Sequence, residues 1–358
     1  KIFNIPKQLI TDYPFDNNYL DSGTSKVHSV LKDNAGNLWI AIYQKGVMMI
    51  PAQPNSFKYI GYKSINKNII GSNCITSLCR DHEGILWIGT DNDGIYGITT
   101  ELKQKVHYAP HDSPSSVPST VFGLYEDSEH NLWFGSYTNG LGRLDKKTGQ
   151  CSYLQNLTDK NGNRIQRVYD LVEDQDKRLW IATMGAGLFY YDLKTGQSVY
   201  DPKFNAATKK YKWISCLLYA GDNHLYVGTY DGIRCIDLST DDFKTEEILS
   251  RHIIHSLYED PQGNIWIGNS EGLAEWNPQT QQLKTYTTAH GLSSNAVYAI
   301  KGDGQDNLWI STNAGMSRFN LNTHTFSNFY ADDGLQGNEF SKNASFADHN
   351  GILWFGGT

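Results

Sequence analysis

Short apolar runs recur along the whole chain, and each has the same order of side chains. Leu or Ile comes first, Trp second, and Ile or Phe third. The Trp residues of these runs are Trp39, Trp87, Trp133, Trp180, Trp266, Trp309 and Trp354. A further run has Tyr226 in place of Trp, and neighbouring runs lie 40 to 48 residues apart. This spacing is typical of the four-stranded blade of a β-propeller and exceeds that of most helical repeats.

The polar positions divide each repeat into four short strands. The second strand contains the Trp run, whose consecutive apolar residues indicate that both of its faces are covered. A tight turn with Gly begins the third strand, and the fourth is more polar, for example in residues 57–62 and 282–286. We therefore expect the Trp side chain to pack between neighbouring blades. The first strands are apolar and end in an acidic turn, as in residues 27–33, 75–81, 121–127, 168–174 and 254–260.

The two ends of the sequence suggest how the array closes. The last repeat stops after its second strand, whereas residues 2–5 and 8–13 have the pattern of a third and a fourth strand. Residues 1–13 would then complete the blade that residues 344–358 begin, which removes the exposed strand edges of an open array. The sequence thus predicts an all-β fold, a single β-propeller domain over residues 1–358 with eight four-stranded antiparallel blades. Seven blades are the alternative, if residues 1–13 pack elsewhere or the array is part of a longer double propeller.

The composition agrees with short strands joined by tight turns, because aromatic residues make up 13% of the chain, charged residues 19%, and Gly occurs 33 times. The net charge of -7 is mild and the basic residues are scattered, so we expect no nucleic-acid partner. The sequence has no run of 18 apolar residues, so we expect no direct insertion of this segment into a membrane. Five cysteines without regular spacing predict buried free thiols rather than disulfides or a zinc site.

Catalytic and metal-binding motifs are missing from the sequence. It contains no His-Glu-x-x-His, no Gly-x-Ser-x-Gly and no phosphate-binding Gly loop. Glu-Asp pairs at residues 126–127, 173–174 and 259–260 recur at the same turn of successive repeats, which indicates a structural role. Residues 91–94, Asp-Asn-Asp-Gly, lack the further ligands of a calcium loop and suit a hairpin turn. We predict no catalytic residue, no metal and no cofactor.

Candidate ligand contacts lie on one face of the predicted propeller. The turn after the second strand and the connection into the next repeat share this face, where loops vary while the sheets stay rigid. Exposed rings with carboxylate and guanidinium groups suit a sugar, whose apolar faces stack on rings and whose hydroxyls need donors and acceptors. The plainer interpretations are solvated turn residues and, for the Trp, a plug in the channel mouth. The predicted ligand-binding residues are Tyr43, Asp91, Tyr137, Arg167, Trp213 and Tyr230.

The motif set resembles two-component regulator propeller repeats. It comprises the acidic turn, Gly-x-Leu-Trp-Ile-Gly-Thr, Gly-Leu and a strand ending in Asp, with residues 289–297 and 333–340 as further matches; Tyr226 departs from the pattern. In that family the propellers form the extracytoplasmic sensor of a membrane-spanning hybrid histidine kinase and respond to glycans. The resemblance implies a periplasmic segment of an inner-membrane protein, an oligosaccharide ligand, and neighbouring propeller or β-sandwich domains. For the full-length sensor it also implies a homodimer.

Two classes of function fit the sequence. The first is a non-enzymatic sensor that recognises an oligosaccharide or positions its neighbouring domains for signalling. A plain protein-interaction scaffold differs from this sensor in its partner. The second class is a propeller lyase or hydrolase resembling the streptogramin lyases, which would need a His and a carboxylate converging on one mouth. The evenly repeated motifs offer no such constellation, so we expect a sensor, with any kinase activity outside this chain.

Overall fold

The computed structural model describes residues 2–4, 8–11, 25–34, 36–50, 57–61, 69–71, 74–99, 104–159, 161–200, 212–240, 243–348 and 351–358. The chain divides into two compact units, Lys1–Ser72 with Asp333–Leu335 and Asn73–Asp332 with Gln336–Thr358. Strands make up most of the regular structure. Short 3-10 helices occur at η2 (Thr288–His290) and η3 (Ala331–Asp333).

The first unit contains the N-terminal strands and the first repeat. β1 (Ile2–Asn4) pairs antiparallel with β2 (Leu9–Thr11), as the sequence predicts for these two segments. β3 (Val27–Lys32), β4 (Leu38–Ile42) and β5 (Gly46–Ile50) form a three-stranded antiparallel sheet. The fourth strand predicted at residues 57–62 is not observed among the described residues, because residues 57–61 are not part of a strand; residue 62 lies outside the described residues.

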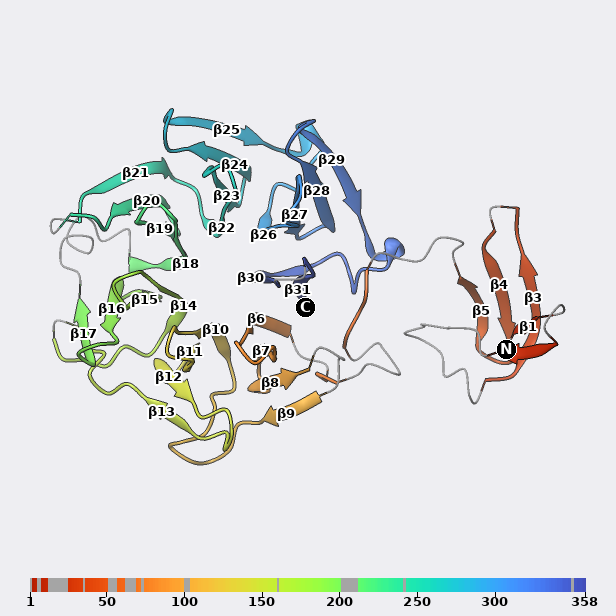
Figure 1. Ribbon diagram of the computed structural model, residues 1–358, viewed down its shortest axis with the longest axis horizontal. Helices are drawn as coiled ribbons and strands as arrows, with labels where there is room; N and C mark the ends of the chain where they lie inside the picture. The colour runs from red at the N-terminus through yellow and green to blue at the C-terminus, as the bar shows by residue number, and fades with distance from the viewer. Residues whose placement is uncertain are drawn as a thin grey trace. The chain divides into compact units, whose positions relative to one another are not determined.

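The second unit is a ring of antiparallel sheets (Figure 1). Its inner strands are β6 (Cys74–Arg80), β10 (Val121–Glu126), β14 (Val168–Glu173), β18 (Ile214–Tyr219), β22 (Ile254–Glu259), β26 (Val297–Gly302) and β30 (Phe340–Ala347). Next to them run β7 (Leu86–Asp91), β11 (Leu132–Ser136), β15 (Arg178–Thr183), β19 (His224–Thr229), β23 (Ile265–Asn269), β27 (Asn307–Thr312) and β31 (Leu353–Gly357).

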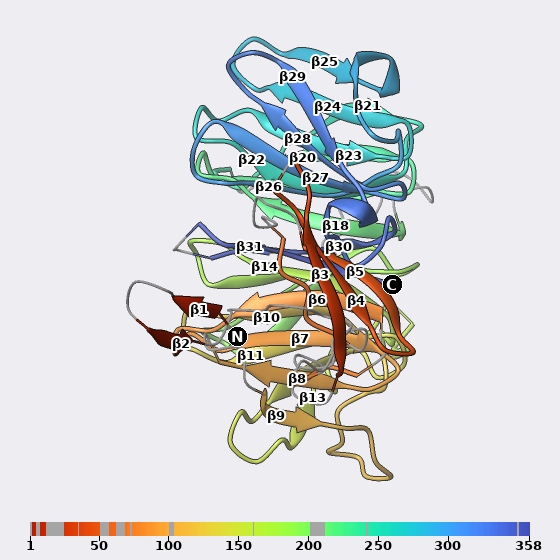
Figure 2. The ribbon, with the colours of Figure 1, turned by 90° about the vertical axis from the view of Figure 1, so that its right-hand side faces the viewer.

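Six of these sheets continue outward through a third and a fourth strand. The third strands are β8 (Ile95–Ile98), β12 (Leu141–Leu144), β16 (Leu188–Asp192), β20 (Gly232–Asp237), β24 (Gly272–Asn277) and β28 (Met316–Asn320). The fourth strands are β9 (Gln104–Tyr108), β13 (Cys151–Tyr153), β17 (Gln197–Tyr200), β21 (Thr245–Ser250), β25 (Gln282–Tyr286) and β29 (Thr325–Phe329). Figure 2 shows the order from β6 to β9 from the side. The predicted β-propeller of four-stranded antiparallel blades is confirmed.

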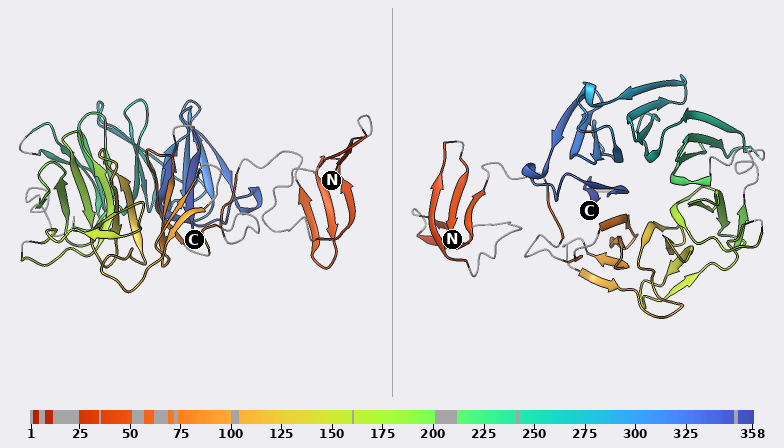
Figure 3. Two further views of the ribbon diagram at one scale, coloured as in Figure 1. Left: turned by 60° about the horizontal axis from the view of Figure 1, so that its bottom comes forward. Right: turned by 180° about the vertical axis from the view of Figure 1, so that it is seen from behind.

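The ring closes where its seventh sheet meets its first. Inner strand β30 lies beside both β26 and β6, which leaves no room for another sheet between them (Figure 3). Arg80 on β6 forms an ion pair with Asp348, 2.5 Å between Nη1 and Oδ2, and the Asp348 side chain is fully buried. The unit therefore has seven sheets, the alternative count, and not the eight that the number of repeats favoured. Whether residues 1–13 complete the sheet of β30 and β31 stays a prediction.

The second strands fill the interfaces between sheets. Every residue of β11 and β23 is buried. Trp180 on β15 is 0% exposed and packs in one cluster with Leu225 and Val227 of β19, which belongs to the next sheet. Burying an aromatic side chain of this size is a large favourable term, so stacking each sheet on its neighbour is what stabilises the ring. The predicted packing of the Trp side chains between blades is confirmed for Trp87, Trp133, Trp180 and Trp266, whereas Trp39 in the first unit is 41% exposed.

An aspartate directly after inner strands β6, β10, β14 and β22 supplies the hydrogen-bond acceptor that the buried indole of the second strand needs. Asp81 accepts the backbone N–H of Ile85 with Oδ1 (2.9 Å) and the indole N–H of Trp87 with Oδ2 (2.8 Å). One side chain thus satisfies both the turn and a buried indole that would otherwise lack a partner. The same carboxylate-to-indole bond joins Asp33 to Trp39, Asp127 to Trp133, Asp174 to Trp180, and Asp260 to Trp266, at 2.6–2.9 Å.

Two repeats depart from this arrangement. In the sheet of β18 to β21 the aspartate position is Ala220, and the Trp position is Tyr226. Donor and acceptor are therefore replaced together. At the closing sheet, the Oδ2 of Asp348 is paired with Arg80, and the indole N–H of Trp354 is buried without a hydrogen-bond partner.

A double-mutant cycle tests the coupling of carboxylate and indole. Asp127→Ala and Trp133→Tyr should each be destabilising, because each leaves the other partner unpaired. The double variant reproduces the natural combination of Ala220 and Tyr226, so it should lose less stability than the sum of the single losses. We expect a coupling energy of about 0.5–3 kcal/mol in equilibrium urea unfolding. Asp127→Ala combined with Trp266→Tyr, in a different sheet, is the control and should be additive; additivity of the first pair would contradict the assignment.

Candidate ligand-binding site

Backbone hydrogen bonds fix one face of the second unit. At several interfaces, the turn between the second and third strands donates an N–H to a carbonyl just ahead of the next inner strand. These bonds are Asn92 to Ser119 (2.9 Å), Gly140 to Gln166 (2.7 Å), Gly185 to Lys212 (2.7 Å) and Gly315 to Asn338 (2.6 Å). The two kinds of connection that the sequence placed on one face therefore touch one another, and their side chains are held on rigid sheets.

Tyr137 and Arg167 meet across one of these interfaces. Tyr137 follows β11, Arg167 precedes β14, and the guanidinium carbon lies 4.8 Å from the centre of the phenol ring. This is a cation–π distance. Tyr137 is 42% exposed and also meets the edge of Phe122, whose ring is 4.9 Å from that of Tyr169. Two residues predicted separately from the sequence thus form one surface with two further rings.

Trp213 and Tyr230 form a second pair beside the first. Tyr230 donates its backbone N–H to the carbonyl of Trp213 (3.1 Å), and the two rings lie edge to face with centres 5.8 Å apart. The Trp213 and Tyr230 side chains are 42% and 39% exposed. Burial raises the pKa of Tyr169, and Tyr230 adds to that shift. We call Phe122, Tyr137, Tyr169, Trp213 and Tyr230 the aromatic arc.

The other two predicted residues lie outside the aromatic arc. Asp91 ends β7 and accepts a hydrogen bond from Thr120 (2.9 Å) at the neighbouring interface. Tyr43 belongs to the first unit, where its ring stacks on that of His28 with centres 5.4 Å apart. Within the second unit the structure therefore brings together Tyr137, Arg167, Trp213 and Tyr230 and places Asp91 at another interface, whereas Tyr43 belongs to the first unit.

Polar groups that the sequence analysis missed meet near the axis of the ring. Asp170 on β14 accepts hydrogen bonds with Oδ2 from the backbone of Leu217 on β18 (2.8 Å) and from the Asn343 amide on β30 (3.2 Å). Because β14 and β30 are not neighbours in the ring, the Asn343 bond crosses its centre. Burial raises the pKa of Asp170 to about 6 against the effect of these hydrogen bonds. Burial lowers the pKa of Lys301 on β26, and the charge of Asp170 opposes that change.

A third group of side chains lines the same region on β22, β26 and β30. The rings of His255 and Tyr298 lie 5.5 Å apart, and the Lys342 ammonium is 5.6 Å from the centre of the Tyr298 ring. Burial, with a smaller effect of Lys342, lowers the pKa of His255 to about 4, so its imidazole is neutral at neutral pH. The contacts that the structure gives for His255 are with Tyr298 and Lys342.

Bulges explain why these inner-strand residues were hard to predict. Inner strands β10, β14, β18, β22 and β26 shift register after their first residue, so the next residue leaves the simple alternation of faces; β6 does so one residue later. Phe122, Tyr169, His255 and Tyr298 occupy that second position. The signal available in the sequence was a charged or amide side chain inside an otherwise apolar strand, as with Asp170, Lys301 and Asn343.

The cysteines do not provide a nucleophile. All five are free; Cys74 is partly buried and the others are buried, as predicted. Burial raises the pKa of Cys79, Cys151 and Cys235 to about 12, and that of Cys216 further still. These four buried thiols therefore stay protonated and are poor nucleophiles at neutral pH.

Comparison with known proteins agrees with the repeat pattern and the ring. A family model, two component regulator propeller, matches residues 69–92, 115–138, 159–185, 248–271 and 291–314. These five segments match two-component regulator propeller repeats. Each match covers an inner strand and its second strand, namely β6 and β7, β10 and β11, β14 and β15, β22 and β23, and β26 and β27, so the family unit coincides with the hairpin that holds the Trp. The sheet of β18 and β19, where Tyr226 replaces Trp, lies outside the matched segments.

Solved structures with this fold include sensor domains and an enzyme. The extracellular domain of the putative hybrid two component system BT3049 from B. thetaiotaomicron has a TM-score of 0.81 and 22% identity, over 99% of this chain and 47% of that one. For the extracellular domain of BT4673 from the same organism, the values are 0.70 and 19%, over 92% and 44%. A streptogramin B lyase gives 0.60 and 17%, over 80% and 91%.

The regulator propeller chain spans about half the length of those two extracellular domains. At these identities the similarity shows the fold. None of the curated proteins matches the chain. Within the described residues, no helix has the length and apolar character needed to cross a membrane.

The raised pKa of Asp170 predicts a pH-dependent cost of folding. A carboxyl whose pKa is about 6 when folded and 3.8 as a model group is disfavoured as an anion in the fold. The favourable contribution of this carboxyl to the free energy of unfolding is complete below about pH 4. It is lost as the pH rises through 6. Asp170→Asn keeps an acceptor for the Leu217 N–H and cannot ionise. We expect the stability of this variant relative to wild type to rise between pH 4 and pH 7 in urea unfolding; a constant difference would contradict a buried, weakly acidic Asp170.

Proposed function

We propose that the chain is a ligand-sensing module of a longer extracytoplasmic sensor, without enzymatic activity of its own, and that it binds an oligosaccharide at the aromatic arc. The observation that carries this proposal is the grouping on one face of exposed rings from the sheets of β10–β13 and β18–β21 with the Arg167 guanidinium, which precedes the sheet between them. Contiguous exposed apolar surface rimmed by polar groups commonly marks a binding site.

The chemistry of the arc suits a sugar chain. The exposed faces of Tyr137, Trp213 and Tyr230 offer stacking surfaces to the apolar faces of successive sugar rings. Arg167 donates hydrogen bonds to hydroxyl or acidic groups, and its contact with Tyr137 holds the guanidinium in place. Since the connecting turns are tied to rigid sheets, the site is largely formed before the ligand arrives, which reduces the entropy lost on binding.

The proposed setting is a periplasmic sensor protein anchored in the inner membrane. The similarity to extracellular domains of two-component systems, over about half of their length, supports neighbouring propeller or β-sandwich domains as partners. In this proposal, ligand binding at the arc is passed to those domains, the full-length sensor is a homodimer, and kinase activity lies in another part of it. The segment itself makes no direct contact with the interior of the membrane.

A lyase is the second candidate because of the structural similarity to streptogramin B lyase. The described contacts of His255 do not include the carboxylate that such chemistry would need. The sensor proposal is therefore favoured. Assaying each glycan for cleavage alongside binding separates the two, because a lyase would consume the ligand that a sensor returns unchanged.

Removing one aromatic side chain from the aromatic arc tests the proposal. Trp213→Ala should weaken binding of the best glycan from a calorimetric panel at least about tenfold, which corresponds to roughly 1.4 kcal/mol of stacking. Leu283→Ala is the matched control, since Leu283 is an exposed apolar residue (36%) on outer strand β25. It should leave affinity unchanged.

Circular dichroism and melting temperature verify that both variants fold. Undiminished affinity of a folded Trp213→Ala protein would contradict the placement of the ligand. Failure of every glycan to bind the wild type would favour the scaffold role.

A further inference from the structure

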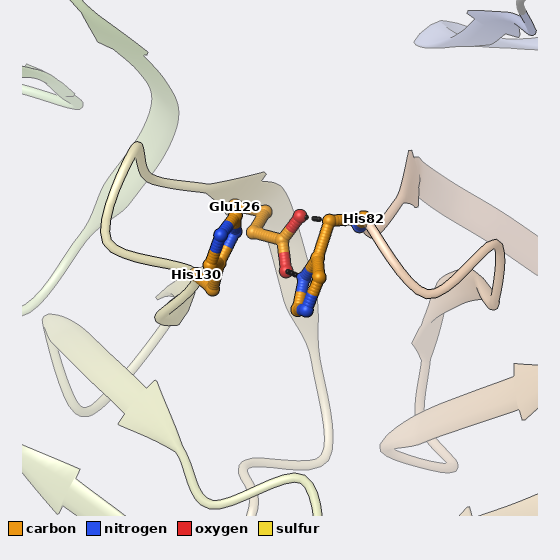
Figure 4. Close-up of side chains that lie close together, drawn as sticks. All are labelled: His82, Glu126 and His130. Atoms are coloured by element: carbon orange, nitrogen blue, oxygen red, sulfur yellow. Dashed lines mark hydrogen bonds and ion pairs between the residues drawn. The ribbon is translucent and has the colours of Figure 1, made fainter.

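Two histidines and a glutamate meet at the opposite end of the sheets from the aromatic arc. His82 lies in the turn from β6 to β7, Glu126 ends β10, and His130 lies in the turn from β10 to β11 (Figure 4). One ligand atom from each, an imidazole nitrogen or a carboxylate oxygen, lies within 4.8 Å of the other two. A pocket of about 350 Å³ opens beside them. Because His82 and Glu126 are far apart in sequence and belong to different sheets, no sequence motif predicts this cluster.

The glutamate has a structural role that the repeat itself supplies. Glu126 Oε2 accepts the backbone N–H of His82 (2.7 Å), which ties the turn of one sheet to the inner strand of the next. The same bond recurs from Ser128 to Glu173 (2.7 Å) and from Gly221 to Glu259 (3.1 Å). The carboxylate is thus placed by the backbone at all three interfaces and needs no imidazole to hold it.

The neighbouring interface shows what the histidines add. The position of His82 is occupied there by Ser128, and that of His130 by Lys177. His130 and Lys177 share a left-handed backbone, with φ of 67° and 68°. Lys177 reaches Glu173 through its ammonium group, 3.6 Å away. The repeat therefore folds with a hydroxyl and an ammonium at these two positions, so the paired imidazoles are not required by the packing of the turns.

The two imidazoles are arranged around the carboxylate. The His82 ring stacks on that of His130 with centres 3.8 Å apart, and His82 Nδ1 lies 2.8 Å from Glu126 Oε1. Both histidines are exposed, whereas Glu126 is partly buried. The two rings can therefore turn towards a common point while the carboxylate stays fixed, and solvent can reach the remaining side.

We propose that His82, Glu126 and His130 form a binding site for one divalent transition cation of the Zn²⁺ type. Two imidazoles with one carboxylate are a known ligand set for Zn²⁺, which binds N and O donors at about 2.0–2.2 Å and leaves a fourth position for water. Imidazole ligands favour Zn²⁺, Ni²⁺ or Cu²⁺ over Mg²⁺ and Ca²⁺, which prefer oxygen. The bound ion joins the turns of two adjacent sheets.

Lys146 is the charged group that a cation must displace in part. Its ammonium lies 2.8 Å from Glu126 Oε1 and 3.3 Å from Asp81 Oδ2. The buried Asp81 carboxylate keeps the ammonium paired when Glu126 Oε1 binds the ion. Glu126 also has its second oxygen on the His82 backbone, so one oxygen can bind the ion while the other maintains the contact between sheets.

The test variant copies two side chains of the neighbouring interface. His82→Ser with His130→Lys introduces the Ser128 and Lys177 side chains on the same backbone, so the fold should persist. In calorimetry of the full chain with ZnCl₂ after removal of chelator, wild type should bind one ion at this site. The double variant should bind at least tenfold more weakly. Zn²⁺ should raise the melting temperature of wild type and not that of the variant, because a ligand of the native state alone stabilises it.

His107→Ser is the control for histidine content, since His107 pairs with Asp93 (3.4 Å) at another site. It should bind Zn²⁺ as wild type does. Binding that is absent in wild type, or equally strong in the double variant, would overturn the proposal. If the double variant does not fold, the single variants His82→Ser and His130→Lys provide the same comparison, because each removes one of three ligands. These outcomes are independent of glycan binding at the aromatic arc.

Discussion

A hydrogen bond from a buried indole to an aspartate six residues earlier is the constraint on which the ring depends. Stacking sheets on one another buries the Trp side chains, and burial leaves each indole N–H in need of an acceptor. The aspartate that caps the preceding turn supplies it, as Asp81 does for Trp87. Turn geometry, strand register and sheet packing are thereby fixed together. Ala220 and Tyr226 indicate that a repeat can dispense with the pair if both members change.

Much of the fold could be predicted because it is local and repeated. The Trp runs predicted the position of the second strand in each repeat. The fourth strand β25 has the bounds Gln282–Tyr286 that the sequence predicts. The number of sheets could not be predicted, because closure depends on a contact between Arg80 and Asp348, which are 268 residues apart. The same limit applied to the site. Tyr137 and Arg167 were both placed on the correct face by their position in the repeat, but the bonds of Asp170 across the axis follow from three sheets converging.

The repeat also explains which side-chain positions can differ from one sheet to the next. Positions that serve the scaffold, such as the Glu126 and Glu173 carboxylates, receive a backbone N–H from the neighbouring turn. The side chains beside them are free to differ, as His82 and Ser128 do. At the other end of the sheets, the backbone bonds of the connecting turns leave Tyr137, Trp213 and Tyr230 exposed. One rigid frame thus presents two separate surfaces, one aromatic and one rich in imidazole and carboxylate.

The closing interface differs from the others in the way its aspartate is used. Asp348 pairs with Arg80, and the Trp354 indole N–H is left buried without a partner. A buried donor without an acceptor costs roughly 1–3 kcal/mol. The seam between β31 and β6 is therefore held by charge where the other interfaces use an indole, because the ion pair of Arg80 and Asp348 takes the carboxylate that would accept the Trp354 N–H.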